Sequence, residues 1–530
     1  MVREDDRRRL LRSTASVAAP TLASRLLGYV RDLLQAYFLG TSHGADAFTI
    51  AFTIPNLFRR LTGEGAMTSA FVPTFTEVRA RGDRRETWRF AGIFFWDLAL
   101  VMGALTVLGI VFAPGLVKVI AYGFRTTEGK WAQTIVMTRT MFPYLFFISL
   151  SALASAILNS CRRFFVPAST PILFNLAVIA AAAVAARGAR DPARVFCWGV
   201  VAGGVLQVLF QVPFLWKEGM RFRPGLSFRD PGVRRIGGLM VPGILGAGVY
   251  QVNFALSRMI ASGLERGSTS ALYYSSRLEE LTLGLFSIAL SVALLPMFSE
   301  HAAARDMGEM KRTLGFSLKL TSFVTFPAAA GLVVLSRPII RVLFERGKFD
   351  RGSTALSAAC LLFFALGLPF LSGVKMIAPA FFSLKDTRTP VLVGVGVMAA
   401  NVALSFALKG PLRVGGIALA LSLSQVLNFA ALFALLERRI GAVGRRELAA
   451  PAARGLAASG LMAGGLLLLR PLVDVPAASF VRQAAGLLGA IAAGIVLYGV
   501  FLRLLSPGDA RELAAAVLHA ARPSPGKEAG

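Results

Sequence analysis

The sequence predicts an all-α protein that crosses a membrane many times. The 530 residues are 55% hydrophobic and only 16% charged, whereas soluble domains carry about 25% charged residues. Apolar stretches of about 20 residues, each long enough to cross about 30 Å of hydrocarbon, recur from one end of the chain to the other. The segments between them are too short for a soluble domain, so we expect a polytopic helical membrane protein.

Hydrophobicity along the chain predicts about 14 transmembrane helices. The predicted spans begin near residues 11, 45, 88, 132, 168, 194, 232, 268, 311, 353, 390, 413, 450 and 479. An even number places both termini on one side of the membrane. The segments on that side, such as 79–89, 217–235 and 437–447, are richer in Lys and Arg than 41–44 or 122–130 on the other. Because cytoplasmic loops carry the excess of positive charge, we expect both termini to be cytoplasmic.

An internal repeat predicts two lobes. Six landmarks recur at offsets of 222 to 226 residues: Pro20 and Pro242, Pro73 and Pro296, Pro114 and Pro338, Gly123 and Gly347, Pro143 and Pro369, Pro167 and Pro390. The offset covers six spans, so the two copies run in the same direction through the membrane, as parallel repeats do. Prolines within spans kink helices, and kinks at matching places suggest lobes that rock about a cavity.

The repeat also sets the predicted domain boundaries. We expect an N-terminal lobe over 1–220 (spans 1–6), a C-terminal lobe over 221–445 (spans 7–12), an extra helix pair over 446–510 (spans 13 and 14) and a cytoplasmic tail over 511–530.

Charged residues lie inside several of the apolar spans. Arg25 and Arg31 fall in the first span, Arg59 in the second and Arg277 in the eighth; the same spans hold Asp32, Asp46, Arg60, Glu64, Glu279 and Glu280. A charge at membrane depth is costly, so such residues usually face a wet cavity or a partner and mark the path of a substrate. Arginine's planar fork suits phosphate oxygens, so the four arginines predict an anionic substrate.

The alternative interpretation is that these charges form ion pairs that hold helices together. It suits Arg60 and Glu64, which are four residues apart. For Asp32 and Asp46 it fits as well as a role at the substrate does. The repeat argues for a substrate site, because the arginines are not duplicated: at an offset of about 223, Arg25 and Arg59 meet Ala247–Gly248 and Thr282. A structural network would more often be copied with its scaffold.

Composition argues against several other classes of protein. The net charge is +28, but the basic residues are scattered through short loops instead of clustering on a soluble face, so nucleic acid is not expected as a partner. Membrane lipids are expected as partners. Cys161, Cys197 and Cys360 are far apart and odd in number, which predicts neither a metal site nor a disulfide framework. We expect no cofactor.

Several motifs resemble the MurJ/MviN family of lipid II flippases, part of the multidrug/oligosaccharidyl-lipid/polysaccharide exporter superfamily. They are SRLLGYVRD (24–32), ADAFTIAFTIPNLFRRLTGEGAMTSAFVPTFTE (45–77), FPYLFFISLSALASAILNSCRRFFVPA (142–168), LYYSSRLEEL (272–281), LFERGKF (343–349) and APAFFSLKDTRTP (378–390). The resemblance covers essentially the whole chain, and the block over 24–77 is long and specific.

The resemblance implies a transporter of the bacterial cytoplasmic membrane and not an enzyme. Its substrate would be lipid II, the undecaprenyl-pyrophosphate-linked precursor of peptidoglycan, moved to the periplasmic leaflet; cell-wall synthesis proteins are candidate partners. A central cationic cavity would lie between the lobes, and the extra helix pair would form a groove for the lipid tail. By motif match, Arg25, Arg31, Arg59 and Arg277 would bind substrate, with Asp32, Asp46, Arg60, Glu64, Glu280 and Lys375 in support.

The chain departs from the family pattern in three places. Ser276 precedes the span 8 arginine where relatives often have an acid, and Tyr122 stands where relatives tend to have proline. Some members bind sodium through Asn and Asp one turn apart; here the pair is Asn401 and Ser405, without the carboxylate. The remaining possibilities are that protons or the membrane potential drive transport, or that transport is not coupled to an energy source.

Two other functions fit the sequence less well. An exporter of another polyprenyl-linked glycan or of a drug would share the fold, although the excess of arginines argues against cationic drugs. An enzyme acting on polyprenyl phosphates would need acidic metal-binding clusters or catalytic loops at the membrane face, and we find neither in the sequence.

Overall fold

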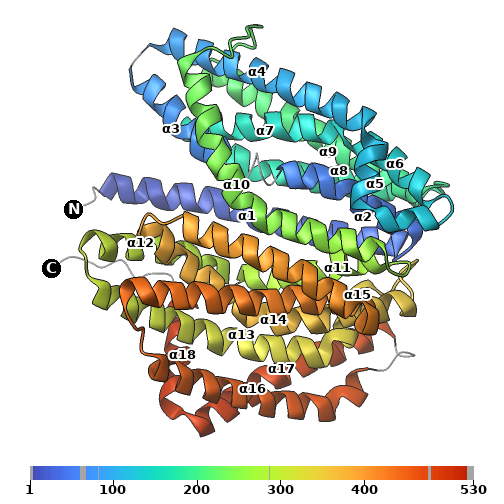
Figure 1. Ribbon diagram of the computed structural model, residues 1–530, viewed down its shortest axis with the longest axis vertical. Helices are drawn as coiled ribbons and strands as arrows, with labels where there is room; N and C mark the ends of the chain where they lie inside the picture. Colours follow the sequence, from blue (N-terminus) through green and yellow to red (C-terminus); the bar gives the residue numbers. More distant parts are fainter. Residues whose placement is uncertain (1–3, 60–66, 82, 286, 475–478, 522–530) are drawn as a thin grey trace. The chain divides into compact units, whose positions relative to one another are not determined.

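The computed structural model describes residues 4–59, 67–81, 83–285, 287–474 and 479–521 (Figure 1). Within these ranges the regular structure is entirely helical, as the composition predicted. Contacts divide the chain into two compact units, one of Met1–Ser270 with Arg346–Asp350 and one of Ala271–Glu345 with Arg351–Gly530. Each unit is described by itself.

The first unit holds ten α-helices and a short 3₁₀ helix within its described residues. They are α1 (Glu4–Leu39), α2 (His43–Phe58), α3 (Met67–Ala80), α4 (Arg84–Val111), α5 (Ala113–Ile120), η2 (Tyr122–Thr126), α6 (Lys130–Met141), α7 (Pro143–Ser160), α8 (Phe165–Ala185), α9 (Pro192–Glu218) and α10 (Pro231–Ser262). Side-chain caps begin several of them; Asp83, for example, accepts from the backbone N–H groups of Arg85 and Glu86, satisfying donors that a helix start leaves unpaired.

The second unit holds the remaining helices of the described chain. They are α11 (Ser268–Leu285), whose first turn lies in the first unit, α12 (Ser287–Ala303), α13 (Met307–Phe344), α14 (Arg351–Ser383), α15 (Arg388–Ile440), α16 (Arg445–Val473), α17 (Phe480–Leu505) and α18 (Pro507–Ala521). The predicted extra pair corresponds to α16 and α17, which pack on α13 through one apolar cluster that includes Phe323, Leu466 and Leu487.

Most predicted spans correspond to one helix or to a helix pair within the described residues. In the described residues nine helices are long and apolar enough to cross a membrane, or ten if α11 and α12 form one span. Predicted spans 11 and 12 form one helix, α15, which is interrupted at Arg413, where φ is 50° and ψ is −133°. Span 4 is divided between α6 and α7 at Pro143. The total of fourteen stays a prediction.

The compact units do not follow the repeat boundary. Although α10 begins the predicted second lobe, it packs against α3 and α2 in the first unit. Landmark glycines of the repeat mark close contacts there. A Cβ on Gly123 would lie 2.3 Å from the Cα of Gly263, and one on Gly347 would lie 2.5 Å from the Tyr37 carbonyl. Glycine is needed at both positions because the backbones approach too closely for any side chain.

Contacts between loops gather arginines at one end of the first unit. Arg79 donates to the Ser160 carbonyl, Arg84 to the Glu218 carbonyl, and Arg235 pairs with Glu77. The loops before α4, between α7 and α8, and between α9 and α10 therefore share this end, which matches the grouping made from loop charge.

Candidate functional site

Arg31 is held by two side chains of the first unit. Its Nε and Nη2 lie 3.0 and 2.7 Å from Oδ1 of Asp32, and its Nη1 donates to Oδ1 of Asn175 on α8 at 3.0 Å. Asn175 in turn donates to the Ser24 carbonyl of α1. The pair is largely buried, with 15% of the Arg31 side chain and 7% of the Asp32 side chain exposed. Arg31 is therefore a fixed charge, positioned by α8.

Arg25 and Arg59 lie in separate segments of the first unit. Arg25 is an exposed residue of α1, and Arg59 follows α2 and donates from Nε to Oδ1 of Asn56 at 3.1 Å. The predicted pair Arg60 and Glu64 lies outside the described residues.

Asp46 lies in a buried network at the opposite end of the unit from the clustered arginines. Its carboxylate accepts from the Nζ of Lys130 at 2.8 Å, from the backbone N–H groups of Gly267 and Ser270, and from the hydroxyls of Thr269 and Ser270. The exposed fractions are 4% for the Lys130 side chain and 1% for Asp46. Five donors saturate this carboxylate, which joins α2 and α6 to the start of α11.

In the second unit, Arg277 forms a local ion pair within α11. Its Nη1 lies 2.7 Å from Oε2 of Glu280, three residues along α11. Its guanidinium also lies 4.9 Å from the centroid of the Tyr273 ring. Both partners are partly exposed, at 23% for Arg277 and 40% for Glu280. The Nη2 of Arg277 lies 3.5 Å from the Tyr273 hydroxyl, and the partial exposure of the side chain leaves the guanidinium within reach of solvent.

Three further residues to which the family resemblance drew attention, Lys375, Asn401 and Ser405, lie in the second unit. Lys375 is half-buried in α14, where its carbonyl accepts from the Ser291 hydroxyl of α12. Asn401 and Ser405 are fully buried in α15, with the Ser405 hydroxyl 3.5 Å from Oδ1 of Asn401.

Three buried polar residues that join helices were missed in the sequence. Lys130 looked like a loop charge, and Asn175 carries no charge to attract notice. Arg258 is a charge inside α10 and could have been found by the same search that found Arg31. It is 9% exposed, donates to the Thr53 hydroxyl of α2 at 3.1 Å, and lies 5.2 Å from the Phe254 ring centroid.

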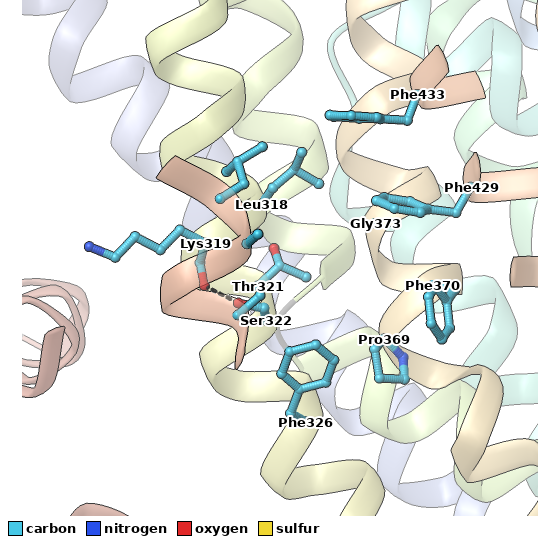
Figure 2. Close-up of a pocket in the computed structure, with 13 residues that line it drawn as sticks. Leu318, Lys319, Thr321, Ser322, Phe326, Pro369, Phe370, Gly373, Phe429 and Phe433 are labelled. Atoms are coloured by element: carbon cyan, nitrogen blue, oxygen red, sulfur yellow. Dashed lines mark hydrogen bonds between the residues drawn. The ribbon is translucent and has the colours of Figure 1, made fainter. Parts of the chain in front are cut away.

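An apolar pocket of about 270 Å³ lies among α13, α14, α15 and α16 (Figure 2). Its walls include Phe326, Phe370, Phe429 and Phe433, and Figure 2 shows their rings around the opening. The Lys319 side chain points away from it in the view, and its Nζ pairs with Asp509 and Glu512 of α18. The pocket suits a hydrocarbon chain, because its lining is almost wholly apolar.

A family model described as lipid II flippase MurJ matches residues 35–481. The chain belongs to this family. A protein of Vibrio cholerae named probable lipid II flippase MurJ is 35% identical over 507 residues, covering 94% of this chain and 96% of the relative. The Burkholderia cenocepacia lipid II flippase MurJ is 35% identical over 434 residues, covering 81% and 84% of the two chains.

Solved structures agree with membership of the MurJ family. Lipid II flippase MurJ in an inward closed conformation superposes with a TM-score of 0.77 at 26% identity, covering 94% of this chain and 99% of that one. An inward-facing multidrug resistance transporter of the MATE family superposes with a TM-score of 0.65 at 12% identity, covering 79% and 96%. The second likeness shows the shared fold alone. A family of flippases is a family of transporters, and the chain is accordingly not an enzyme.

Proposed function

We propose that this protein flips lipid II from the cytoplasmic to the periplasmic leaflet of the bacterial inner membrane, with both termini in the cytoplasm. The observation that carries the proposal is the family match over 35–481, to which the arrangement of Arg277 adds a chemical reason. A lipid's tail can stay in the bilayer, whereas its pyrophosphate and sugars need a wet, cationic path.

In this mechanism the arginines take over part of the hydration of the pyrophosphate. Arg25, Arg31, Arg59 and Arg277 bind its oxygens, and the acids Asp32, Glu64 and Glu280, with Arg60 and Lys375, adjust the charge around them. Asp46 supports the site indirectly, by holding α2, α6 and the start of α11 together. The fixed Arg31 supplies a preorganised positive charge, and Arg277 supplies a partly exposed one. Rocking of the two lobes then exposes the substrate to each leaflet in turn. A membrane potential negative inside favours export of an anion by about 2.3 kcal/mol per charge per 100 mV.

The lipid tail would occupy the apolar pocket among α13 to α16. Its aromatic walls support this assignment, and α16 is the member of the extra pair that lines it, through Leu448, Ala449 and Ala452. Ala452→Trp should narrow the pocket and slow transport. Leu456→Trp, one turn along the same helix at a side chain 58% exposed, is the matched control and should leave transport unchanged.

The proposal is tested by rescue of a bacterium depleted of its own lipid II flippase. The readout is the lipid II that an externally added cleaving enzyme can reach. Wild type should restore access and Arg277→Ala should not, at matched membrane abundance. Arg312→Ala is the control, because Arg312 makes the same type of pair with Glu309, three residues away, at 2.6 Å. A well-expressed wild type that leaves lipid II inaccessible would contradict the assignment of lipid II as the cargo, and another polyprenyl-linked glycan would become the proposed cargo.

A further inference from the structure

A cationic groove opens at the arginine-rich end of the first unit. It has a volume of about 700 Å³ and lies between the start of α4 and the segment that follows α9. Five arginines line it, with no acidic residue among the lining side chains: Arg84, Arg85, Arg89, Arg221 and Arg223. Trp88 and Ile93 supply an aromatic and an aliphatic wall. We refer to it as the arginine groove.

The chain holds the groove open with specific contacts. Gly219 ends α9 with φ of 111°, and a Cβ there would lie 2.9 Å from Nη2 of Arg84 and 3.0 Å from Nε1 of Trp88. Arg223 donates its backbone N–H to the Arg221 carbonyl at 2.8 Å, which makes a tight turn. Farther along, Asp97 of α4 accepts from the Ser227 backbone N–H at 3.0 Å. These contacts fix the backbone on both sides of the groove.

Charge distinguishes the arginine groove from the pocket beside it. That neighbouring pocket is lined by Arg81, Arg89 and Arg235 and by the acids Glu77, Glu86 and Asp230, so its charges balance. In the groove, no carboxylate of the described chain lies within ion-pair distance of Arg85, Arg89, Arg221 or Arg223. Several like charges gathered around one hollow repel one another, and a bound anion would relieve that repulsion.

The surroundings of the groove indicate an anion that belongs to the membrane. Exposed apolar side chains lie close to its lining residues in the sequence, namely Trp216 (52% exposed), Leu226 (58%) and Phe228 (48%). The Phe222 ring anchors the segment between α9 and α10, with its centroid 5.0 Å from that of Phe95 on α4. Aromatic residues gather where a membrane meets water, and basic pockets between helices on the cytoplasmic side bind anionic lipid headgroups. Exposed apolar side chains close to the lining residues match the acyl chains of a lipid better than the polar surface of an acidic soluble protein.

We propose that the arginine groove is a binding site for the phosphate headgroup of an anionic phospholipid of the cytoplasmic leaflet. The guanidinium groups donate in pairs to the phosphate oxygens, and the indole N–H of Trp88 is a further donor. The acyl chains lie along the exposed apolar side chains. This site is separate from the arginines assigned to lipid II, and it does not depend on the proposed transport activity.

The test is a titration of the full-length protein in neutral detergent, followed by native mass spectrometry. Phosphatidylglycerol is the probe and zwitterionic phosphatidylethanolamine the reference lipid. Wild type should bind phosphatidylglycerol preferentially. R85Q/R89Q and R221Q/R223Q should each weaken it about tenfold, and the quadruple variant at least about thirtyfold. Because these side chains are exposed, the two double variants should fold; a melting curve checks this.

The control removes four arginines that already pair with acids, in the variant R81Q/R163Q/R235Q/R312Q. It should bind phosphatidylglycerol like wild type. Equal losses in the control and in the groove variants would overturn the proposal, as would equal binding of the two lipids by wild type. Displacement of phosphatidylglycerol by millimolar inorganic phosphate would assign the groove to a soluble anion instead. The assay contains no lipid II, so its failure is distinguishable from failure of the transport proposal.

Discussion

Asp46 and Arg277 are both charges inside predicted spans, but the structure treats them in opposite ways. Asp46 accepts from five donors on two other segments and is 1% exposed. Arg277 has a local partner three residues away on its own helix, and almost a quarter of its side chain is exposed. A saturated, buried charge holds helices together, whereas a locally paired and exposed one can still bind a ligand. The energetic cost of placing a charge at membrane depth does not by itself distinguish a structural charge from one that binds a ligand.

The largest effect should come from Asp46→Asn. It leaves the Lys130 ammonium buried without its counter-charge, and breaking a buried pair costs about 3–5 kcal/mol. We expect a large loss of thermal stability and of membrane abundance. Removing both charges, in Asp46→Asn/Lys130→Met, should recover part of that loss because no uncompensated charge remains. A double variant as unstable as the single one would mean that the other donors, and not the ion pair, dominate.

Arg277→Ala should give the opposite pattern, a loss of transport with little change in stability. Pairs of this kind on a helix surface contribute about 0.3–0.5 kcal/mol, so the melting temperature should hardly move. Arg277→Lys should recover transport only in part, because an ammonium lacks the bidentate fork. Lipid II accessibility and thermal stability, measured on the same preparations, check both statements. A destabilised Arg277→Ala would place Arg277 with Asp46 as a structural charge.

Asn175→Ala should fall between these extremes. It removes the bridge from Arg31 to α8 and the side-chain hydrogen bond to the Ser24 carbonyl, so we expect a loss of stability of about 1–2 kcal/mol. Transport should fall as well, because Arg31 loses one of the side chains that position it. The measurement pairs a thermal melt with the accessibility assay, and Asn175→Asp serves as the comparison, since its carboxylate can still accept from Arg31.

The smallest effect concerns Asp386, a saturated carboxylate in the turn between α14 and α15. Burial raises the pKa of its carboxyl, but hydrogen bonds from the Thr389 hydroxyl and backbone N–H and the charge of Arg439 outweigh it, so the pKa lies below its usual value. A lowered pKa means that the ionised form stabilises the fold above about pH 4. The contribution, about 1 kcal/mol, is lost as the pH falls below that value.

Melting temperatures of wild type and Asp386→Asn between pH 7 and pH 3 check this prediction. The two curves should differ at neutral pH and converge in acid. Arg439→Gln keeps the hydrogen bonds from Thr389 to Asp386, so its melting temperature at neutral pH should fall by only part of the drop seen in Asp386→Asn. Curves that stay parallel down to pH 3 would contradict the assigned cause.

Much of the architecture was predictable from local patterns. The break in α15 at Arg413 falls where a new span was expected to begin, and the pair of Arg277 with Glu280 follows from their spacing on one helix. The repeat glycines Gly123 and Gly347 both proved to be points of close backbone contact. These features depend on periodicity and on residue type, which the sequence states directly.

The partners of the other charges could not be predicted in this way. Lys130 lies 84 residues from Asp46 in the sequence, and Asn175 lies 144 from Arg31. The arginine groove likewise joins the start of α4 to the segment after α9, and its arginines on the two sides lie more than 130 positions apart. Loop charge grouped these segments on one side of the membrane but could not show that five arginines share one hollow.

The sequence by itself determined the class of the protein, the positions of its charges and the repeat, because apolar length and residue spacing follow from the order of residues along the chain. The tertiary structure decided which charges are neutralised and which remain able to bind. That outcome depends on the few donors and acceptors that packing brings within about 3 Å of each charge, and those come from segments far apart in the chain.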